Sequence, residues 1–273
     1  MSVSAHDAFR DAVRRLELAG VPTPQIDASA LMEAACDGRS AAVDTLPDEM
    51  AADFARMVQR RVQREPVSHI TQRRAFYEHE FIVTSDVLDP RPDTEALVDE
   101  ARWCEFETVL DLGTGSGCIL LSLLAAKPGA QGVGTDISAA ALDVASRNAE
   151  KIGVADRARL VESDWFDQVD GRFDLIVSNP PYITAEAFDA LQPEVKEFEP
   201  KIALTPGGDG LASYRIITAG APDYLNAGGA LMVEIGYDQG QAVSELYDQA
   251  GFTDISVLPD INGKDRVVRA VLR

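Results

Sequence analysis

Cysteine is scarce in this sequence, which has three in 273 residues. Cys36, Cys104 and Cys118 lie far apart, without the spacing of a metal site or a disulfide framework, and Cys118 falls in an apolar helical run that predicts a core position. No apolar run reaches the roughly 18 residues of a membrane-spanning helix. The charged N-terminus lacks the apolar stretch of a secretion signal. We therefore expect a cytoplasmic protein that contacts no membrane and binds no metal.

Basic residues are also under-represented, with 25 Lys and Arg against 45 Asp and Glu, a formal net charge of −20. Because Lys and Arg supply most non-specific affinity for nucleic acids, direct nucleic-acid binding is not expected. Basic side chains do cluster between Arg56 and Arg74. Two interpretations of this cluster stay open: a solvated helix face followed by a linker, or a docking patch for an acidic or RNA-associated partner.

The first 72 residues have apolar side chains at helical spacing. Ser4 is placed to cap a first helix, and Pro22 and Pro24 interrupt the chain before a second one. We expect three helices whose apolar stripes form the core of a small bundle. The stripe residues are Phe9, Val13, Leu16, Ile26, Ala30, Leu31, Ala34, Met50, Phe54, Met57, Val58 and Val62.

The pattern changes after the helical region. Residues 75–83 (AFYEHEFIV) are aromatic and β-branched and predict one or two strands. Pro90 and Pro92 hold the next segment extended. Asp93 or Thr94 can then cap a helix by accepting a backbone hydrogen bond.

From about residue 107 onward, predicted strands and helices alternate, which favours an α/β fold with a parallel sheet covered on both faces. The expected strands are 108–112, 131–135, 158–162, 174–178, 230–235, 254–258 and 266–272. The expected helices are 118–126, 139–152, 214–225 and 239–250.

A glycine-rich segment, Asp111–Gly117 (DLGTGSG), follows the first of these strands and opens the first of these helices. Glycines let the backbone approach a ligand closely, and this crevice is the ligand site of doubly wound sheets. Asp136 ends the second strand, where a carboxylate can accept hydrogen bonds from ribose hydroxyls. The spacing D-x-G-x-G-x-G resembles motif I of class I S-adenosylmethionine-dependent methyltransferases. The predicted cofactor contacts are Gly113, Thr114, Gly115, Ser116, Gly117 and Asp136.

Asp164 and Trp165 end the third strand. In a methyltransferase this position borders the adenine, where a carboxylate can accept from the exocyclic amine and an indole can pack. Both residues are therefore predicted cofactor contacts. For Trp165, a half-buried packing role stays open as the alternative.

The tetrad Asn179–Tyr182 (NPPY) follows the strand 174–178 at the edge of the same crevice. The prolines fix the backbone so that the Pro180 carbonyl is held as one acceptor, and the Asn179 carboxamide oxygen offers a second. An amide or aromatic amine needs both, because its nitrogen lone pair is delocalised and must be oriented for in-line transfer. Tyr182 can cover a planar substrate with its ring.

We therefore predict that Asn179, Pro180 and Tyr182 are catalytic and position the substrate nitrogen. Adenine N6, cytosine N4 and glutamine N5 all suit this geometry. The tetrad thus indicates the kind of nitrogen but not the polymer that carries it.

Taken together, these segments resemble the HemK/PrmC family of protein-(glutamine-N5) methyltransferases, which act on peptide-chain release factors. The segments that carry the resemblance are 90–95 (PRPDTE), 110–117, 163–165, 178–182, 198–204 (FEPKIAL), 208–211 and 264–267. One departure is Asp89, where the family usually has an apolar residue.

The resemblance implies a helical domain, 1–72, that recognises the release factor, a β-hairpin linker, 73–95, and a methyltransferase domain, 96–273. That domain would be Rossmann-like, with a mostly parallel seven-stranded sheet. The resemblance also implies that Asn179 contacts the cofactor and that Asn179, Pro180, Pro181 and Tyr182 bind the substrate glutamine. The protein would methylate the glutamine of a Gly-Gly-Gln loop as a monomer, converting S-adenosylmethionine to S-adenosylhomocysteine without a metal.

Two alternatives stay open. One is a glutamine-N5 methyltransferase of a large-subunit ribosomal protein, although that group has Pro-Arg-Ser-Pro where this chain has Pro-Arg-Pro-Asp. The other is an N6-adenine nucleic-acid methyltransferase, which the acidic charge disfavours. A non-enzymatic binding module would leave the Asn-Pro-Pro-Tyr tetrad beside a cofactor loop without an explanation.

Overall fold

The computed structural model describes residues 3–36, 38 and 44–273, which divide into two compact units. The first unit is Met1–Arg73 together with Gln192–Phe198, and the second is Arg74–Leu191 together with Glu199–Arg273. Among the described residues, no helix has the length and apolar character needed to cross a membrane.

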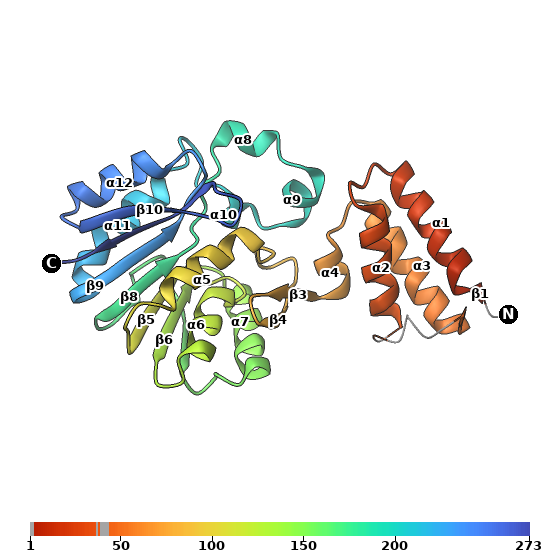
Figure 1. Cartoon of the computed structure of the whole chain (residues 1–273), viewed down its shortest axis with the longest axis horizontal. Coiled ribbons are helices and arrows are strands. Elements are labelled where there is room, and N and C mark those ends of the chain that lie inside the picture. Colours follow the sequence, from red (N-terminus) through yellow and green to blue (C-terminus); the bar gives the residue numbers. More distant parts are fainter. Residues whose placement is uncertain (1–2, 37, 39–43) are drawn as a thin grey trace. The chain divides into compact units, whose positions relative to one another are not determined.

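The first unit is the predicted helical bundle (Figure 1). Its elements are β1 (Val3–Ser4), α1 (Ala5–Leu18), α2 (Pro24–Ala35), β2 (Thr45–Leu46), α3 (Asp48–Val62), α4 (Val67–Thr71) and, from later in the chain, α9 (Pro193–Phe198). Ser4 caps α1 as predicted, since its hydroxyl accepts from the Asp7 amide at 3.3 Å. The prediction for Ile26 is wrong: its side chain is 69% exposed, and α2 buries Asp27 and Ala28 in its place, whereas Leu31 is buried as predicted.

The basic cluster of residues 56–74 contains an internal ion network that neither interpretation foresaw. Arg61 is 5% exposed, and its guanidinium donates to Asp27 at 2.6 Å and to Glu194 of α9 at 3.0 Å. Arg64 donates to both oxygens of Glu194, at 2.6 and 2.7 Å. Part of the cluster is therefore neither solvated nor available to a partner, and it ties α9 to the bundle.

The second unit begins with a hairpin of β3 (Arg73–Phe76) and β4 (His79–Ile82), which confirms the predicted strands. A turn of 3-10 helix, η2 (Pro92–Thr94), leads into α5 (Glu95–Ala101). Of the two residues predicted to cap this helix, Asp93 and Thr94, it is Thr94 that occupies the N-cap position, but its side chain makes no capping hydrogen bond to α5. Its hydroxyl is used elsewhere, as described below.

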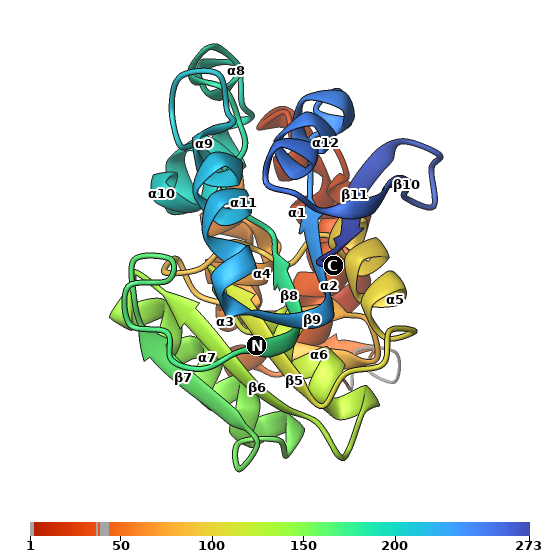
Figure 2. The ribbon, with the colours of Figure 1, turned by 90° about the vertical axis from the view of Figure 1, so that its left-hand side faces the viewer.

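A seven-stranded sheet forms the centre of this unit, in the order β10-β11-β9-β8-β5-β6-β7. Strands β9, β8, β5, β6 and β7 are parallel, and β11 runs antiparallel to both of its neighbours. Figure 2 shows β5, β6 and β7 side by side. This confirms the mostly parallel sheet. The strands are β5 (Thr108–Leu112), β6 (Gln131–Asp136), β7 (Ala158–Glu162), β8 (Phe173–Ser178), β9 (Leu225–Glu234), β10 (Thr253–Pro259) and β11 (Asp265–Val271).

Helices cover both faces of the sheet because its strands are apolar on both sides. Val109 and Leu110 of β5 are neighbours in sequence but belong to opposite core clusters. The Val109 cluster includes α5 and α6, and the Leu110 cluster includes α11 and α12. The remaining helices are α6 (Cys118–Ala126), α7 (Ala139–Ile152), α8 (Ala185–Asp189), α10 (Lys201–Leu204), α11 (Ala212–Tyr224) and α12 (Gly240–Gln249).

Candidate active site

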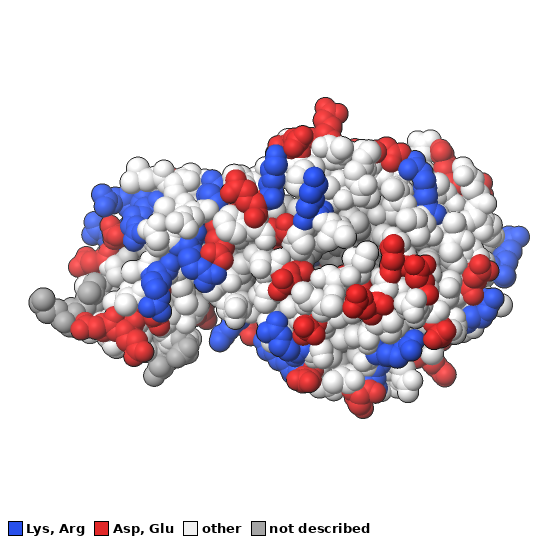
Figure 3. All heavy atoms as spheres, turned by 180° about the vertical axis from the view of Figure 1, so that it is seen from behind, with Lys and Arg blue, Asp and Glu red and all other residues white. Residues whose placement is uncertain are grey.

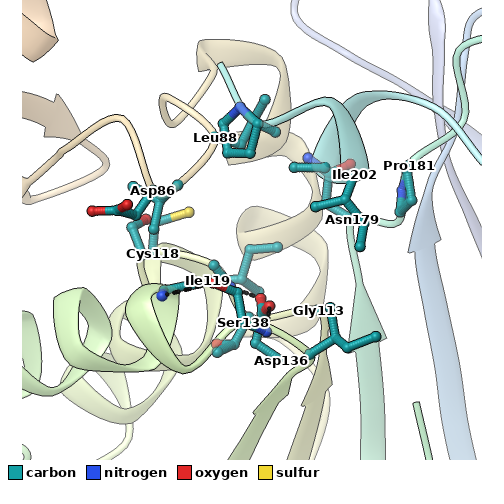
Figure 4. Close-up of a pocket in the computed structure, with 18 of the residues that line it drawn as sticks. Asp86, Leu88, Gly113, Cys118, Ile119, Asp136, Ser138, Asn179, Pro181 and Ile202 are labelled. Carbon is teal, nitrogen blue, oxygen red and sulfur yellow. Dashed lines mark hydrogen bonds between the residues drawn. The ribbon is translucent and has the colours of Figure 1, made fainter. Parts of the chain in front are cut away.

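A pocket lies at the carboxyl ends of β5, β6, β7 and β8, where parallel sheets bind their ligands. It has about 1100 Å³ of empty space, counting its open mouth. Figure 4 shows Asn179 and Pro181 on one side of it and Asp86 and Cys118 on the other. The predicted residues among its lining are Gly113, Thr114, Gly115, Ser116, Asp136, Asp164, Trp165, Asn179 and Pro181.

The glycine loop has the open backbone that a closely approaching ligand needs. Gly113, Gly115 and Gly117 have φ of 70°, 55° and 80°, a region that side chains other than glycine rarely adopt. Gly113 and Gly115 also have open space where a Cβ would stand, so the loop presents bare backbone to the pocket. Gly117 has another reason to be glycine: a Cβ there would lie 2.7 Å from the Leu121 side chain. It is therefore a packing position at the start of α6.

Asp136 ends β6 beside this loop, with its carboxylate partly committed to the backbone. Its two oxygens accept from the amides of Gly115 and Ser138, each at 2.9 Å. Burial raises the pKa of Asp136, whereas these amide hydrogen bonds oppose the shift. A carboxylate oxygen has more than one lone pair, so Asp136 can hold the loop and still accept from ligand hydroxyls. The loop and Asp136 together fit the adenosyl part of S-adenosylmethionine.

Asp164 and Trp165 follow β7 and both line the pocket. Trp165 has a φ of 49° and is half-buried, with its ring against the α11 and α12 core cluster. The Ser163 hydroxyl donates to the Trp165 carbonyl at 3.1 Å and accepts from the Gln168 amide at 3.0 Å. Trp165 therefore both packs against the core and lines the pocket, so the two roles considered for it do not exclude each other.

Hydrogen bonds to several side chains hold the Asn-Pro-Pro-Tyr loop in place. Ser213 donates to the Pro181 carbonyl at 3.1 Å, and Gln239 donates to the Tyr182 carbonyl at 3.2 Å. The Tyr182 hydroxyl donates to Glu234 at 3.3 Å, and burial raises the pKa of this tyrosine well above its usual range. Pro180 and Tyr182 are not among the residues described as lining the pocket.

Asn179 does line the pocket, and its carboxamide has a defined orientation. The Nδ2 atom donates to the Thr94 hydroxyl at 3.1 Å. One N–H is therefore directed away from the reaction space, and Oδ1 is the atom left to act as an acceptor. Sequence reasoning placed Thr94 as a helix cap and did not identify this contact.

Several other pocket residues were not predicted from the sequence. Asp86, Val87 and Leu88 come from the segment after the hairpin, and Ile202 comes from α10. Cys118, expected in the core, is half-buried and lines the pocket, and burial raises the pKa of its thiol to about 12. The wall formed by residues 86–94 could have been anticipated from the Pro-Arg-Pro segment, which the resemblance singled out.

Asp89, which stands where the family usually has an apolar residue, is buried beside a basic side chain. It is 5% exposed, and one carboxylate oxygen lies 3.6 Å from the Arg74 guanidinium. Nearby, Arg91 donates to buried Glu199 at 2.5 Å. Burial raises the pKa of Glu199 to about 7 although Arg91 opposes the shift. Arg91 and Pro200 line the pocket, so this ionic cluster supports its wall.

Comparisons with known proteins agree with this geometry. The PrmC N-terminal domain family matches residues 7–71, and the methyltransferase small domain family matches residues 82–209. A methyltransferase structure from Pyrococcus furiosus shares the fold, with a TM-score of 0.56 at 16% identity over 78% of this chain and 96% of that one.

Relatives named release factor glutamine methyltransferase match nearly the whole chain. The protein from Cereibacter sphaeroides is 50% identical, covering 98% of both chains. The one from Caulobacter vibrioides is 42% identical, covering 99% of this chain and 97% of its own. This chain belongs to the release factor glutamine methyltransferase family.

Proposed function

We propose that this protein methylates the side-chain N5 of the glutamine in the Gly-Gly-Gln loop of peptide-chain release factors. The observation that carries the proposal is the Asn179 carboxamide, held by Thr94 with its oxygen available beside the glycine loop. The names of the relatives support glutamine and the release factor as the target. S-adenosylmethionine, when bound, supplies the methyl group.

Two acceptors position the substrate amide. Asn179 Oδ1 accepts one N–H of the glutamine, and the Pro180 carbonyl accepts the other. Together they orient the nitrogen and favour its pyramidalisation, so that its lone pair is directed along the line of transfer. Both acceptors are neutral, so this chemistry depends on orientation. The nitrogen becomes cationic as it gains the methyl group, is then acidic, and loses one N–H proton to water, so no strong base is needed.

The residues that line the pocket would bind different parts of the cofactor. The backbone of Gly113–Gly117 and the carboxylate of Asp136 hold the sugar and amino-acid parts of the cofactor, and Asp164 and Trp165 border its adenine. Leu88 and Ile202 add apolar surface to the wall of the pocket. Tyr182 anchors the loop through Glu234.

We propose that residues 1–72 recognise the body of the release factor and that the enzyme acts as a monomer on a protein, not on nucleic acid. The net charge of −20 favours a protein substrate over a polyanion. On the face shown in Figure 3, acidic and basic side chains are interspersed, which suits a mixed protein surface better than a phosphate backbone.

The test uses three parallel reactions, each with the purified protein and labelled S-adenosylmethionine. The substrate is a release factor in the first, a large-subunit ribosomal protein in the second and DNA in the third. The release factor should be labelled, and peptide mass spectrometry should locate the methyl group on the loop glutamine. A factor with glutamate in place of that glutamine lacks the nitrogen and should take no label. Methylation of the glutamate variant, or of DNA or the ribosomal protein alone, would refute the proposal.

A further inference from the structure

Two segments that carry the family resemblance, 90–95 and 264–267, contain charged residues to which the proposed reaction assigns no role. The two segments meet in space, since the Arg266 guanidinium lies 3.2 Å from the Asp93 carboxylate. We infer that Arg266 and Asp93 are positioning residues, which fix the place of η2 and, through it, the orientation of the Asn179 carboxamide. This inference rests on the proposed function, because it concerns how the proposed acceptor is kept in place.

Arg266 is a cation with a fixed position at the start of β11. It is 6% exposed, and its Nη2 and Nε atoms donate to the Asp260 carboxylate at 3.2 and 3.4 Å. Its Nη1 atom donates to the Ile235 carbonyl, just after β9, at 3.2 Å. Asp260 is itself held by the amides of Asn262 and Lys264, at 2.8 and 3.1 Å. Because a guanidinium is planar and presents its donors in fixed directions, these contacts anchor it to the ends of β9 and β10.

The segment η2 has little internal structure that could fix its own position. It is a single turn of three residues, and its first residue, Pro92, has no backbone N–H to donate. The Thr94 amide donates to the Arg91 carbonyl at 3.0 Å, but the Thr94 side chain makes no capping hydrogen bond to α5. The position of η2 therefore depends on contacts that its side chains make with other segments, among them the ion pair of Asp93 with Arg266.

Asp93 and Thr94 are adjacent, so a movement of one displaces the other. The contact at risk is the hydrogen bond from Asn179 Nδ2 to Thr94 Oγ1, whose length of 3.1 Å leaves little room before it is lost. Without this contact the carboxamide is free to rotate and to present its –NH₂ to the –NH₂ of the substrate. Donor would then face donor, and methyl transfer would be slower.

An ion pair that only supported the fold would behave differently. The Asp93 side chain is 43% exposed, and ion pairs with an exposed partner contribute little to stability. Removing the Asp93 charge should therefore slow methyl transfer while the protein unfolds at nearly the same denaturant concentration. A loss of rate without a loss of stability is what separates positioning from support of the fold.

The experiment compares single-turnover methylation of a release factor by the full-length protein and its variants. Asp93→Asn removes the charge at nearly constant shape and should lower the rate at saturating release factor about 10-fold, because misplaced reacting groups transfer slowly. The release-factor concentration at half-maximal rate and the calorimetric affinity for S-adenosylmethionine should be little changed. Asp93→Glu keeps the charge and should restore most of the rate. Asp99→Asn is the matched control, because Asp99 lies in α5, is 57% exposed and pairs with Arg102 at 3.3 Å. The control should retain the wild-type rate.

Two double variants test whether the effect passes through Arg266 and Asn179. Arg266→Lys keeps a charge but loses the planar fork, so it should be slow, and adding Asp93→Asn should slow it little further. In an Asn179→Ala background, Asp93→Asn should likewise have little additional effect, because it acts through the missing carboxamide. The Asp93 variants and their control are informative even if Arg266→Lys fails to fold.

The outcomes distinguish this inference from the proposed function. If Asn179→Ala is slow but Asp93→Asn is as fast as wild type, the positioning role is wrong and the proposed acceptor stands. An Asp93→Glu variant as slow as Asp93→Asn, an equal loss in Asp99→Asn, or additive losses in either double variant would also overturn the inference. If Asn179→Ala itself methylates at the wild-type rate, the proposed function fails.

Discussion

Arg61 is a buried cation on which the stability of the helical unit should depend strongly. Its side chain is 6% exposed, and it bonds the Asp27 carboxylate, the Glu194 carboxylate and the Glu65 carbonyl. Arg61→Met keeps the apolar stem but removes the charge. Asp27, whose side chain is 9% exposed, then keeps only the Thr23 hydroxyl, at 2.8 Å. Because a buried carboxylate without its cation is costly, we expect a loss of about 3–5 kcal/mol.

Arg64→Met is the matched control. Arg64 bonds the same Glu194, but its side chain is 22% exposed, and its loss leaves Glu194 paired with Arg61. We expect about 1 kcal/mol there. In the double variant Arg61→Met/Asp27→Leu no buried charge remains at the Asp27 position, so much of the stability should return.

The assay is hydrogen exchange of the full-length protein, read by mass spectrometry on peptides from α2 and α3. A loss of 3–5 kcal/mol corresponds to exchange faster by about one hundred-fold to a few thousand-fold. Trp103 and Trp165 both lie in the second unit, so their fluorescence checks that this unit remains folded. Equal effects of Arg61→Met and Arg64→Met, or unchanged protection in α2, would refute the reasoning.

Three further predictions concern the second unit. Asp136→Ala should weaken cofactor binding by about 1–3 kcal/mol, measured by calorimetry, because the Gly115 and Ser138 amides and the ribose lose their acceptor; unchanged affinity would contradict it. Asn179→Ala should slow single-turnover methylation by roughly 10²-fold, and Asn179→Asp, which keeps an oxygen, by less; two variants as fast as wild type would reject the mechanism. Because burial raises the pKa of Glu234 from 4.5 to about 7, the folded state keeps a proton that the unfolded chain releases. Stability should therefore fall by up to about 3 kcal/mol as pH rises across this window, and Glu234→Gln should show a shallower fall in its urea midpoint.

Strands and helices of the second unit could be predicted closely, because the sequence pattern within each segment is enough to identify it. Predicted and observed bounds coincide for β5, β7 and α6, where apolar runs end at glycine, proline or charged residues. Ile26 shows the limit of the same reasoning. Its helix is real, but the buried face includes Asp27, because Arg61 supplies a cation there. A pattern of apolar residues cannot reveal a buried ion pair.

The ion network inside the basic cluster could not be predicted for a related reason, although Arg56 and Arg60 are exposed as a solvated helix face requires. Arg61 is 34 residues from Asp27 and 133 residues from Glu194, and nothing in its immediate sequence marks either partner. Composition could indicate that positive charge was concentrated there. Whether that charge faces solvent, a partner protein or the chain itself depends on long-range packing.

Thr94 is the position where local and tertiary preferences compete most directly. As the residue before α5, it has the chemistry to accept a backbone N–H, and an unfilled cap costs about 1 kcal/mol. The folded chain instead directs its hydroxyl to Asn179, 85 residues away. Sequence-based rules such as helix capping are broken most often at functional sites. There, the orientation of a reacting group matters more than the stability of the local segment. A residue that can cap but does not, and that contacts the predicted acceptor, is therefore better explained by its effect on Asn179 than by its place at the start of α5.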